Sequence, residues 1–170
     1  MPEEIINRLA NSKLKTFDLE DHYAPGSRTV LDISQWLLEG IVLVESRFRE
    51  SLKTTDFTAY KDHYVAVHCS ADAIVPQWAW MLVQSQLYGI AKKVVYGSLE
   101  QLETEIYREV IASLDVSEFQ DISTIVKGCS NKPVPVAAYA MITDKLQNVS
   151  RSIMYGEACS AVPVFKRKKQ

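Results

Sequence analysis

The apolar positions in the second half of the chain fall into four short runs, separated by longer amphipathic stretches. The runs are rich in β-branched and aromatic residues and cover residues 64–67, 93–96, 122–126 and 152–155. The stretches between them, residues 76–88, 98–114 and 135–146, have helical spacing. Strands that alternate with helices predict an α/β fold, with a small, mostly parallel sheet and flanking helices.

The first 60 residues carry weaker signals and predict an N-terminal α/β elaboration of this core. Lys13–Leu19 alternates as a strand does, Asp32 has the position of a helix N-cap, and residues 45–53 predict a second helix. No linker or low-complexity tract interrupts the chain. We therefore expect a single domain over residues 1–170, with the elaboration in residues 1–60 and the core in residues 61–165.

Two of the predicted helices have distinctive faces. In the helix of residues 98–114, Ser98 and Gln101 form a capping box. An apolar stripe follows, and we expect Glu103, Glu105 and Glu109 mainly on the solvent side. Residues 78–83 are apolar on every side of their helix. That helix is either covered on two sides or an oligomer contact, which leaves a homodimer open.

Two segments of the chain look like copies of one strand–turn–helix–strand unit. Each contains Cys-Ser after a strand, Val-Pro before a helix and Tyr-Gly after the next strand. The first copy has Cys69, Val75-Pro76 and Gly97; the second has Cys129, Val134-Pro135 and Gly156. With one deletion in the loop, Trp80 falls opposite Tyr139. A shortened third copy follows, with Cys159-Ser160 and then Val162-Pro163.

Composition and charge narrow the function classes. The 170 residues are 47% hydrophobic and 24% charged, with a net charge of −2, which is a globular balance and gives no case for nucleic-acid or membrane binding. The basic run 166–169 fits a solvated tail. No apolar stretch reaches the ~18 residues of a membrane span, and the first residues lack a signal-peptide core. We expect a cytoplasmic protein whose three cysteines are reduced or metal-bound.

Cys69, Cys129 and Cys159 each come at, or shortly after, the end of a predicted strand. The carboxyl ends of parallel strands share one edge, where ligands bind in open α/β sheets. Backbone N–H groups and helix N-termini at that edge lower a thiol pKa. Thiolates gathered there would bind zinc or hold an iron–sulfur species. The sequence therefore predicts a three-cysteine metal site.

A tetrahedral site needs a fourth ligand, and His68 is the first candidate because it precedes Cys69. Adjacent strand residues point to opposite faces, however, and the repeat places Gly128 opposite His68. The competing ligands are Asp72, Glu157, His22 and water. There is no Cys-x-x-Cys pair, so packing of the cysteines as small hydrophobic residues stays an alternative.

Four segments resemble a bacterial family known as domain of unknown function 2480. They are residues 12–21 (SKLKTFDLED), 68–76 (HCSADAIVP), 127–130 (KGCS) and 154–160 (MYGEACS). The resemblance covers essentially the whole chain, and the family has no established activity. Its genes tend to lie near those for iron–sulfur cluster assembly, so the resemblance implies an accessory role with assembly proteins as partners.

Three functions are therefore open. The first is a metal-binding protein with zinc or an iron–sulfur species on Cys69, Cys129 and Cys159, assisting cluster assembly. The second is an enzyme for thiol or sulfur-transfer chemistry that uses one cysteine as nucleophile. The third is a structural or interaction module. Metal analysis of anaerobically purified protein separates the first from the other two.

Overall fold

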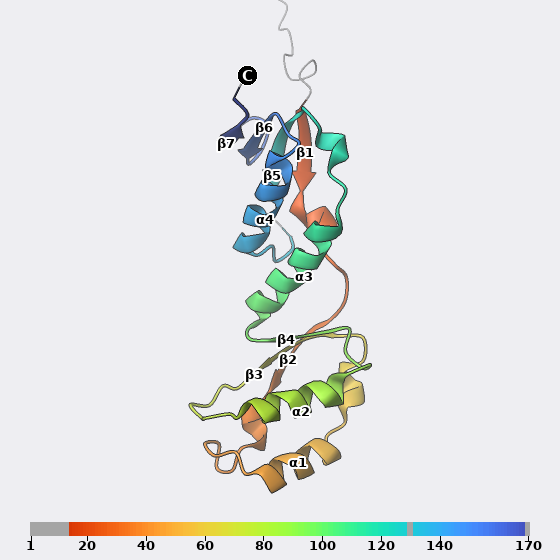
Figure 1. The fold of residues 1–170 in the computed structure, drawn as a ribbon, viewed down its shortest axis with the longest axis vertical. Helices are drawn as coiled ribbons and strands as arrows, with labels where there is room; N and C mark the ends of the chain where they lie inside the picture. Colours follow the sequence, from red (N-terminus) through yellow and green to blue (C-terminus); the bar gives the residue numbers. More distant parts are fainter. Residues whose placement is uncertain (1–13, 129–130, 169–170) are drawn as a thin grey trace, which may run out of the picture. The chain divides into compact units, whose positions relative to one another are not determined.

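The computed structural model describes residues 14–128 and 131–168. They form two compact units, one inserted into the other along the chain. We call residues 25–106 the inserted unit, and residues 14–24 with 107–168 the terminal unit. Each has its own sheet (Figure 1). The boundary expected at residue 60 falls inside the inserted unit, and the single domain expected over residues 1–170 stays a prediction.

The inserted unit is a three-stranded parallel sheet in the order β2-β3-β4. Its elements are β2 (Arg28–Asp32), the 3₁₀ helix η2 (Ile33–Trp36), α1 (Glu45–Thr54), η3 (Phe57–Tyr60), β3 (Tyr64–His68), α2 (Gln77–Leu87) and β4 (Lys93–Tyr96). Its core joins Val65 and Val67 of β3 to Phe48 of α1 and Val83 of α2. The helices α1 and α2 therefore bury the apolar side chains of the sheet, as the amphipathic pattern of α1 predicts.

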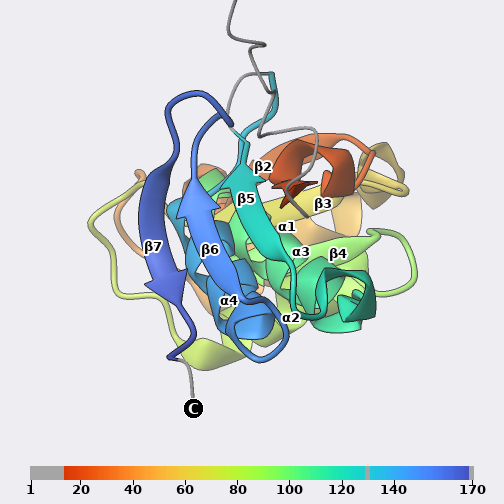
Figure 2. The ribbon, with the colours of Figure 1, turned by 90° about the horizontal axis from the view of Figure 1, so that it is seen from above.

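The terminal unit is a four-stranded sheet in the order β1-β5-β6-β7. Its elements are β1 (Leu14–Asp18), η1 (Leu19–His22), η4 (Ser117–Phe119), β5 (Ser123–Lys127), α4 (Val136–Gln147), β6 (Ser152–Tyr155) and β7 (Val162–Lys166). β5 and β6 run parallel, and β7 runs against β6 (Figure 2). Phe17, Val126 and Ile153 pack with Ile142 of α4.

Helix α3 (Leu99–Ser113) contributes its first half to the inserted unit and its second half to the terminal unit. Its predicted capping box is confirmed: Gln101 N donates to Ser98 Oγ over 3.2 Å, and Ser98 N donates to Gln101 Oε1 over 2.7 Å. In the second half, the Tyr107 hydroxyl is buried and donates to the carbonyl oxygen of Leu19 over 3.0 Å.

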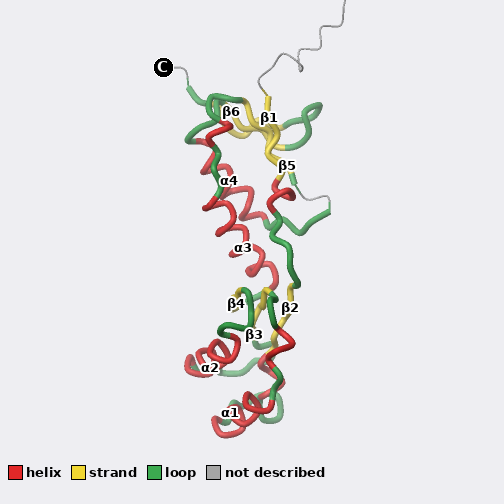
Figure 3. Tube along the Cα trace, turned by 90° about the vertical axis from the view of Figure 1, so that its right-hand side faces the viewer, coloured by secondary structure: helices red, strands yellow, loops and turns green. Residues whose placement is uncertain are grey.

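The prediction of an α/β fold with mostly parallel strands and flanking helices is confirmed. The strands are, however, divided between two small sheets (Figure 3). The four predicted strands are β3, β4, β5 and β6, and the N-terminal strand is β1. Two strands, β2 and β7, were not expected. The shortened third copy differs from the first two, because Val162-Pro163 opens β7 and no helix follows it in the part of the chain that the structure describes.

Candidate functional site at the carboxyl ends of the strands

The predicted repeat is present in the structure. Every residue of β3, α2 and β4 lies 59 positions before its counterpart in β5, α4 and β6. Trp80 corresponds to Tyr139, as expected, and each stacks edge-on against a tyrosine. The ring centroids are 5.7 Å apart for Trp80 and Tyr96, and 5.8 Å apart for Tyr139 and Tyr155.

The cysteines do not follow this spacing, which corrects the predicted alignment of the two copies. At 59 positions, the counterpart of Cys69 is Gly128 and that of His68 is Lys127. Gly128 has a φ of +155°, and a Cβ there would lie 3.0 Å from Leu19 Cβ and 3.1 Å from the Tyr139 hydroxyl oxygen. The narrow space at this position explains why a glycine precedes Cys129 in the second copy.

The carboxyl ends of β1, β5 and β6 form an edge that we call the terminal rim. A cavity of about 260 Å³ lies there, lined by Asp18, Glu20, Lys127, Gly128, Asn131, Tyr155, Gly156 and Glu157. Lys127 Nζ is 3.2 Å from Asp18 Oδ2 and 3.9 Å from Glu157 Oε1. The hydrogen bond to Asp18, together with the charges of Glu157 and Asp18, raises the pKa of Lys127. Its ammonium is therefore protonated at neutral pH.

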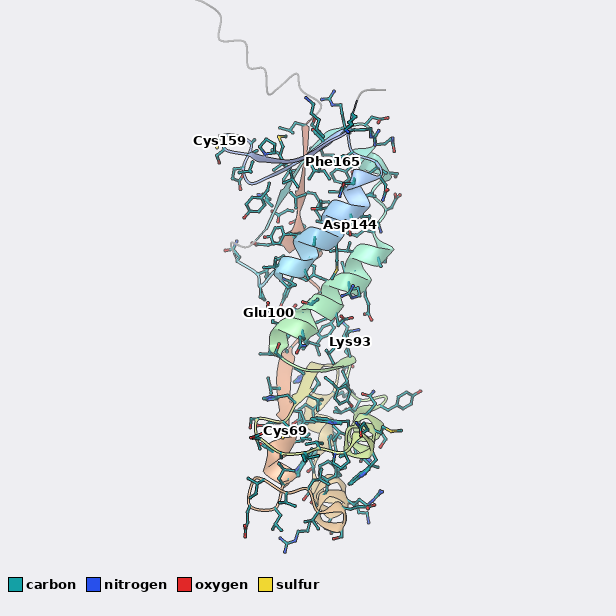
Figure 4. The ribbon with its side chains drawn as sticks, turned by 60° about the vertical axis from the view of Figure 1, so that its left-hand side comes forward. Cys69, Lys93, Glu100, Asp144, Cys159 and Phe165 are labelled. Atoms are coloured by element: carbon teal, nitrogen blue, oxygen red, sulfur yellow. The ribbon has the colours of Figure 1, made fainter. Side chains whose placement is uncertain are left out.

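Two turns complete the wall of this cavity. Asn131 donates its backbone N–H to Glu20 Oε1 over 3.0 Å, which ties the loop after β5 to η1. After β6, Ser160 N donates to Glu157 O over 2.9 Å and closes the turn that contains Cys159. Cys159 is exposed (Figure 4). Cys129 lies outside the described residues and directly follows Gly128 in the chain.

The carboxyl ends of β2, β3 and β4 form the corresponding edge of the other sheet, which we call the inserted rim. A cavity of about 480 Å³ lies there, lined by Val67, His68, Cys69, Trp80, Tyr96 and Gly97. Cys69 is partly buried, and its thiol lies 3.6 Å from the carbonyl oxygen of Ala71, to which it donates. His68 and Cys69 thus border one cavity although they are neighbours along the chain.

Asp32 organises the loops of the inserted rim. Its Oδ1 accepts hydrogen bonds from the N–H groups of Ser34 and Ser70, at 2.9 and 3.0 Å, and its Oδ2 accepts one from the Ser70 hydroxyl at 2.5 Å. Burial of the carboxyl raises its pKa, but the hydrogen bonds from Ser70 and Ser34 outweigh burial and hold the pKa far below its usual range. Ser70 therefore holds the loop after β3 against Asp32.

The structure places the predicted ligands in different sheets. His68 and Cys69 belong to the inserted rim, and Cys159 lies beside the terminal rim. Among the competing ligands, Glu157 lines the terminal cavity, Asp72 is exposed after Cys69, and His22 stacks on Phe17 with centroids 4.7 Å apart. Within residues 14–128 and 131–168, no three His, Cys, Asp or Glu side chains are grouped to hold a metal ion.

The strands that precede the three cysteines do not share one sheet, because β3 belongs to one sheet and β5 and β6 belong to the other. The three-cysteine site itself stays a prediction. Sequence reasoning identified Asp32 as a cap but placed neither Asp32 nor Asp18 at a rim. Each of these carboxylates ends a strand and caps the next 3₁₀ helix. The signal was present, since both stand between two apolar residues, in Phe17-Asp18-Leu19 and Leu31-Asp32-Ile33.

Comparison with known proteins gives one match. A family model described as "Protein of unknown function (DUF2480)" matches residues 3–167, so the chain belongs to that family. No curated protein and no solved structure matches the chain. In the part of the chain that the structure describes, no helix combines the length and the apolar character needed to cross a membrane.

Proposed function

We propose that this member of the DUF2480 family binds a transition metal, as zinc or as an iron–sulfur species, through cysteine thiolates at the terminal rim. One observation carries the proposal. Cys129 follows β5 by two positions and Cys159 follows β6 by four, and these neighbouring parallel strands end at one polar cavity. Ligands of open α/β sheets bind at such carboxyl ends.

The chemistry of the cavity suits a metal held partly by sulfur. Zinc binds thiolates at about 2.3 Å and carboxylate oxygens at about 2.0–2.2 Å, and Glu157 and Asp18 supply carboxylates in the cavity wall. The Lys127 ammonium would offset the negative charge of a thiolate-ligated centre. The exposed position of Cys159 fits transfer to or from another protein. An accessory role in iron–sulfur cluster assembly, in the cytoplasm, is therefore part of the proposal.

Metal analysis of anaerobically purified protein tests this function. We expect about one metal site per chain in the wild-type protein. Cys129→Ser and Cys159→Ser should each lose most of the metal, because a serine hydroxyl does not ionise at neutral pH as a thiol does. Ser160→Ala, which changes an exposed neighbour of Cys159, is the matched control and should keep the metal.

Cys69→Ser and His68→Ala decide between two versions of the site. If the ligands come from the terminal rim, both variants keep the metal. If Cys69→Ser instead loses as much metal as Cys129→Ser, the three-cysteine site that the sequence predicts is supported. If His68→Ala loses the metal as well, His68 is the fourth ligand. Wild-type protein that holds no metal, even after reconstitution with zinc or with iron and sulfide, contradicts the proposal.

One observation favours a second candidate, a thiol or sulfur-transfer enzyme. The Lys127 ammonium stands two residues before Cys129 and borders the cavity, and a nearby cation lowers a thiol pKa. Metal-free protein in which Cys129 reacts rapidly with iodoacetamide at neutral pH, and slowly after Lys127→Gln, would support the enzyme. Equal rates in the two proteins would contradict it.

A further inference from the structure

An apolar groove on the inserted unit runs between helix α2 and strand β4. It has a volume of about 410 Å³ and is lined by Trp80, Met81, Gln84, Ser85, Tyr88 and Tyr96, which we call the edge groove. Met81 is 70% exposed, Tyr88 83% and Tyr96 41%. Large apolar side chains that gather at one surface in this way mark an interaction site.

The terminal unit contains the counterpart of this groove with a strand beside it. Tyr139, Ala140, Thr143, Asp144 and Tyr155 line a groove of about 770 Å³, and at the repeat spacing they correspond to Trp80, Met81, Gln84, Ser85 and Tyr96. Val164 of β7 lines the same groove, and β7 pairs antiparallel with β6. Figure 4 shows Asp144 on α4 and Phe165 on β7. In the terminal unit, the antiparallel strand β7 thus covers the edge of β6. The equivalent edge of β4 in the inserted unit has no strand beside it among the described residues.

The backbone of β4 is available for the same pairing. Gly97 N donates to Val67 O over 2.9 Å, so the odd-numbered residues of β4 turn their backbone groups toward β3. Val94 and Tyr96 consequently turn theirs to the other side, where no strand lies among the described residues. In the terminal unit, the edge strand β7, which occupies the equivalent side of the sheet, carries Pro163 and ends in basic residues, which discourage further pairing. β4 (Lys93–Tyr96) has no proline.

We propose that a second copy of this chain covers the edge groove, with the two β4 strands paired antiparallel about a two-fold axis. The register that joins the outward backbone groups places Val94 opposite Tyr96 of the second copy, and Val95 opposite its own equivalent. Valine opposite tyrosine is a favourable cross-strand pair. The pairing joins two three-stranded sheets into one of six strands, with the α2 helices on the same face.

The absence of charge on α2 favours a second copy over a charged peptide as the occupant. Helix α2 contains no Asp, Glu, Lys or Arg from Gln77 to Leu87, so a charged peptide would find no counter-charge there. In the proposed register, Lys93 lies opposite Gly97 of the second copy, and no like charges within β4 face each other. A four-residue strand pair buries little surface by itself. Met81 and Tyr88, which are 70% and 83% exposed, add apolar surface from both copies to the contact.

The molecular mass of the full chain in solution tests the proposal. We expect the wild-type protein to sediment at twice its chain mass of 19.2 kDa. The double variant Met81→Lys/Tyr88→Lys should sediment as a monomer, because four ammonium groups would gather at the two-fold axis. Val136→Lys changes a residue of α4 that is 80% exposed and should leave the dimer intact. A wild-type monomer, or a dimer that survives the double variant, overturns the proposal.

Hydrogen exchange locates the contact independently of mass. In the wild-type dimer the amides of Val94 and Tyr96 should exchange slowly, and in the double variant they should exchange at least ten-fold faster. The amide of Gly97, which donates to β3, should be protected in both. Rapid exchange at Val94 and Tyr96 in a wild-type dimer overturns the pairing. Protection that arises only when a peptide with the sequence of β7 is added to a monomer would identify a foreign strand as the occupant and also overturn it.

Discussion

At the scale of single residues, the carboxylate of Asp32 joins three backbone or side-chain donors from two loops of the inserted rim. Its pKa lies far below the usual range, because the hydrogen bonds from Ser70 and Ser34 outweigh the opposing effect of burial. A carboxyl whose pKa is lower in the folded than in the unfolded state stabilises the fold above the unfolded pKa. That contribution is lost as the pH falls toward the folded pKa.

Asp32→Asn should therefore destabilise the protein at pH 7 and much less in acid. We expect a loss of about 1–2 kcal/mol in the free energy of unfolding at pH 7, typical of a lost cap or charged hydrogen bond. The difference between wild type and variant should shrink below about pH 4, where the unfolded carboxyl becomes protonated. Urea unfolding at pH 7 and pH 3 measures both. Asp56→Asn, at an exposed cap, is the control with a smaller loss; an equal loss at both pH values for Asp32→Asn would contradict the role of its charge.

Single residues also show which features the sequence predicts and which depend on the folded structure. Asp32 was recognised as a cap because an N-cap needs only local information, the side chain and the residues that follow. The reach of its carboxylate to Ser70, 38 positions away, depends on the pairing of β2 with β3. Likewise, only the folded structure shows that the position after β5 has little space beside Leu19 and Tyr139, which explains the glycine, Gly128, at that position.

At the scale of elements, the first half of α3 is anchored to β2 by a buried ion pair. Arg28 Nε is 2.5 Å from Glu103 Oε1, Arg28 Nη2 is 3.2 Å from Oε2, and the side chains are 11% and 8% exposed. Arg28 also lies over the ring of Tyr64, 4.8 Å from its centroid. The expectation that Glu103 faces solvent is therefore wrong. Helical periodicity shows that Glu103 lies on the polar face of α3, but it does not show that Arg28 of β2 forms an ion pair with it.

Glu103→Gln should lower the free energy of unfolding by about 3–5 kcal/mol, because it leaves the Arg28 guanidinium buried without its counter-charge. Replacing both partners, in Arg28→Met/Glu103→Leu, should recover part of the loss. Glu45→Gln, which removes an exposed pair with Arg49 in the same unit, is the control and should cost about 0.3–0.5 kcal/mol. Urea denaturation of the four proteins gives the comparison. A loss for Glu103→Gln no larger than the control would show that the pair is solvated.

The two strands that escaped prediction are no shorter than the predicted strands, but their sequences lack a complete strand pattern. β2 and β7 have five residues each, and β7 begins with Val162-Pro163, which in the two earlier copies precedes a helix. The helices α2 and α4 and the strands between them were predictable because the prolines that precede the helices, the apolar spacing and the length agree. The pairing of the strands was not predictable, because an apolar run indicates that a strand is buried but not which strands lie beside it.

At the scale of the whole molecule, the two units have separate apolar cores. The cluster around Val65, Phe48 and Val83 belongs to the inserted unit, and the cluster around Val126, Tyr107 and Ile142 to the terminal unit. The sequence gives no sign of this division, because no linker marks the boundaries and the terminal unit is assembled from both ends of the chain. Because the sequence does not reveal the two units, the predicted convergence of the cysteines assumed a single sheet.

Val83 and Ile142 test whether the two cores unfold separately, because they occupy equivalent positions of α2 and α4 and both are fully buried. Val83→Ala and Ile142→Ala each remove apolar volume from one core and should destabilise it by about 1–4 kcal/mol. Native-state hydrogen exchange should then show faster exchange mainly at the amides of β3 for Val83→Ala, and mainly at those of β5 for Ile142→Ala. Equal acceleration in both strands for both variants would mean that the units unfold together, as the single domain expected from the sequence requires.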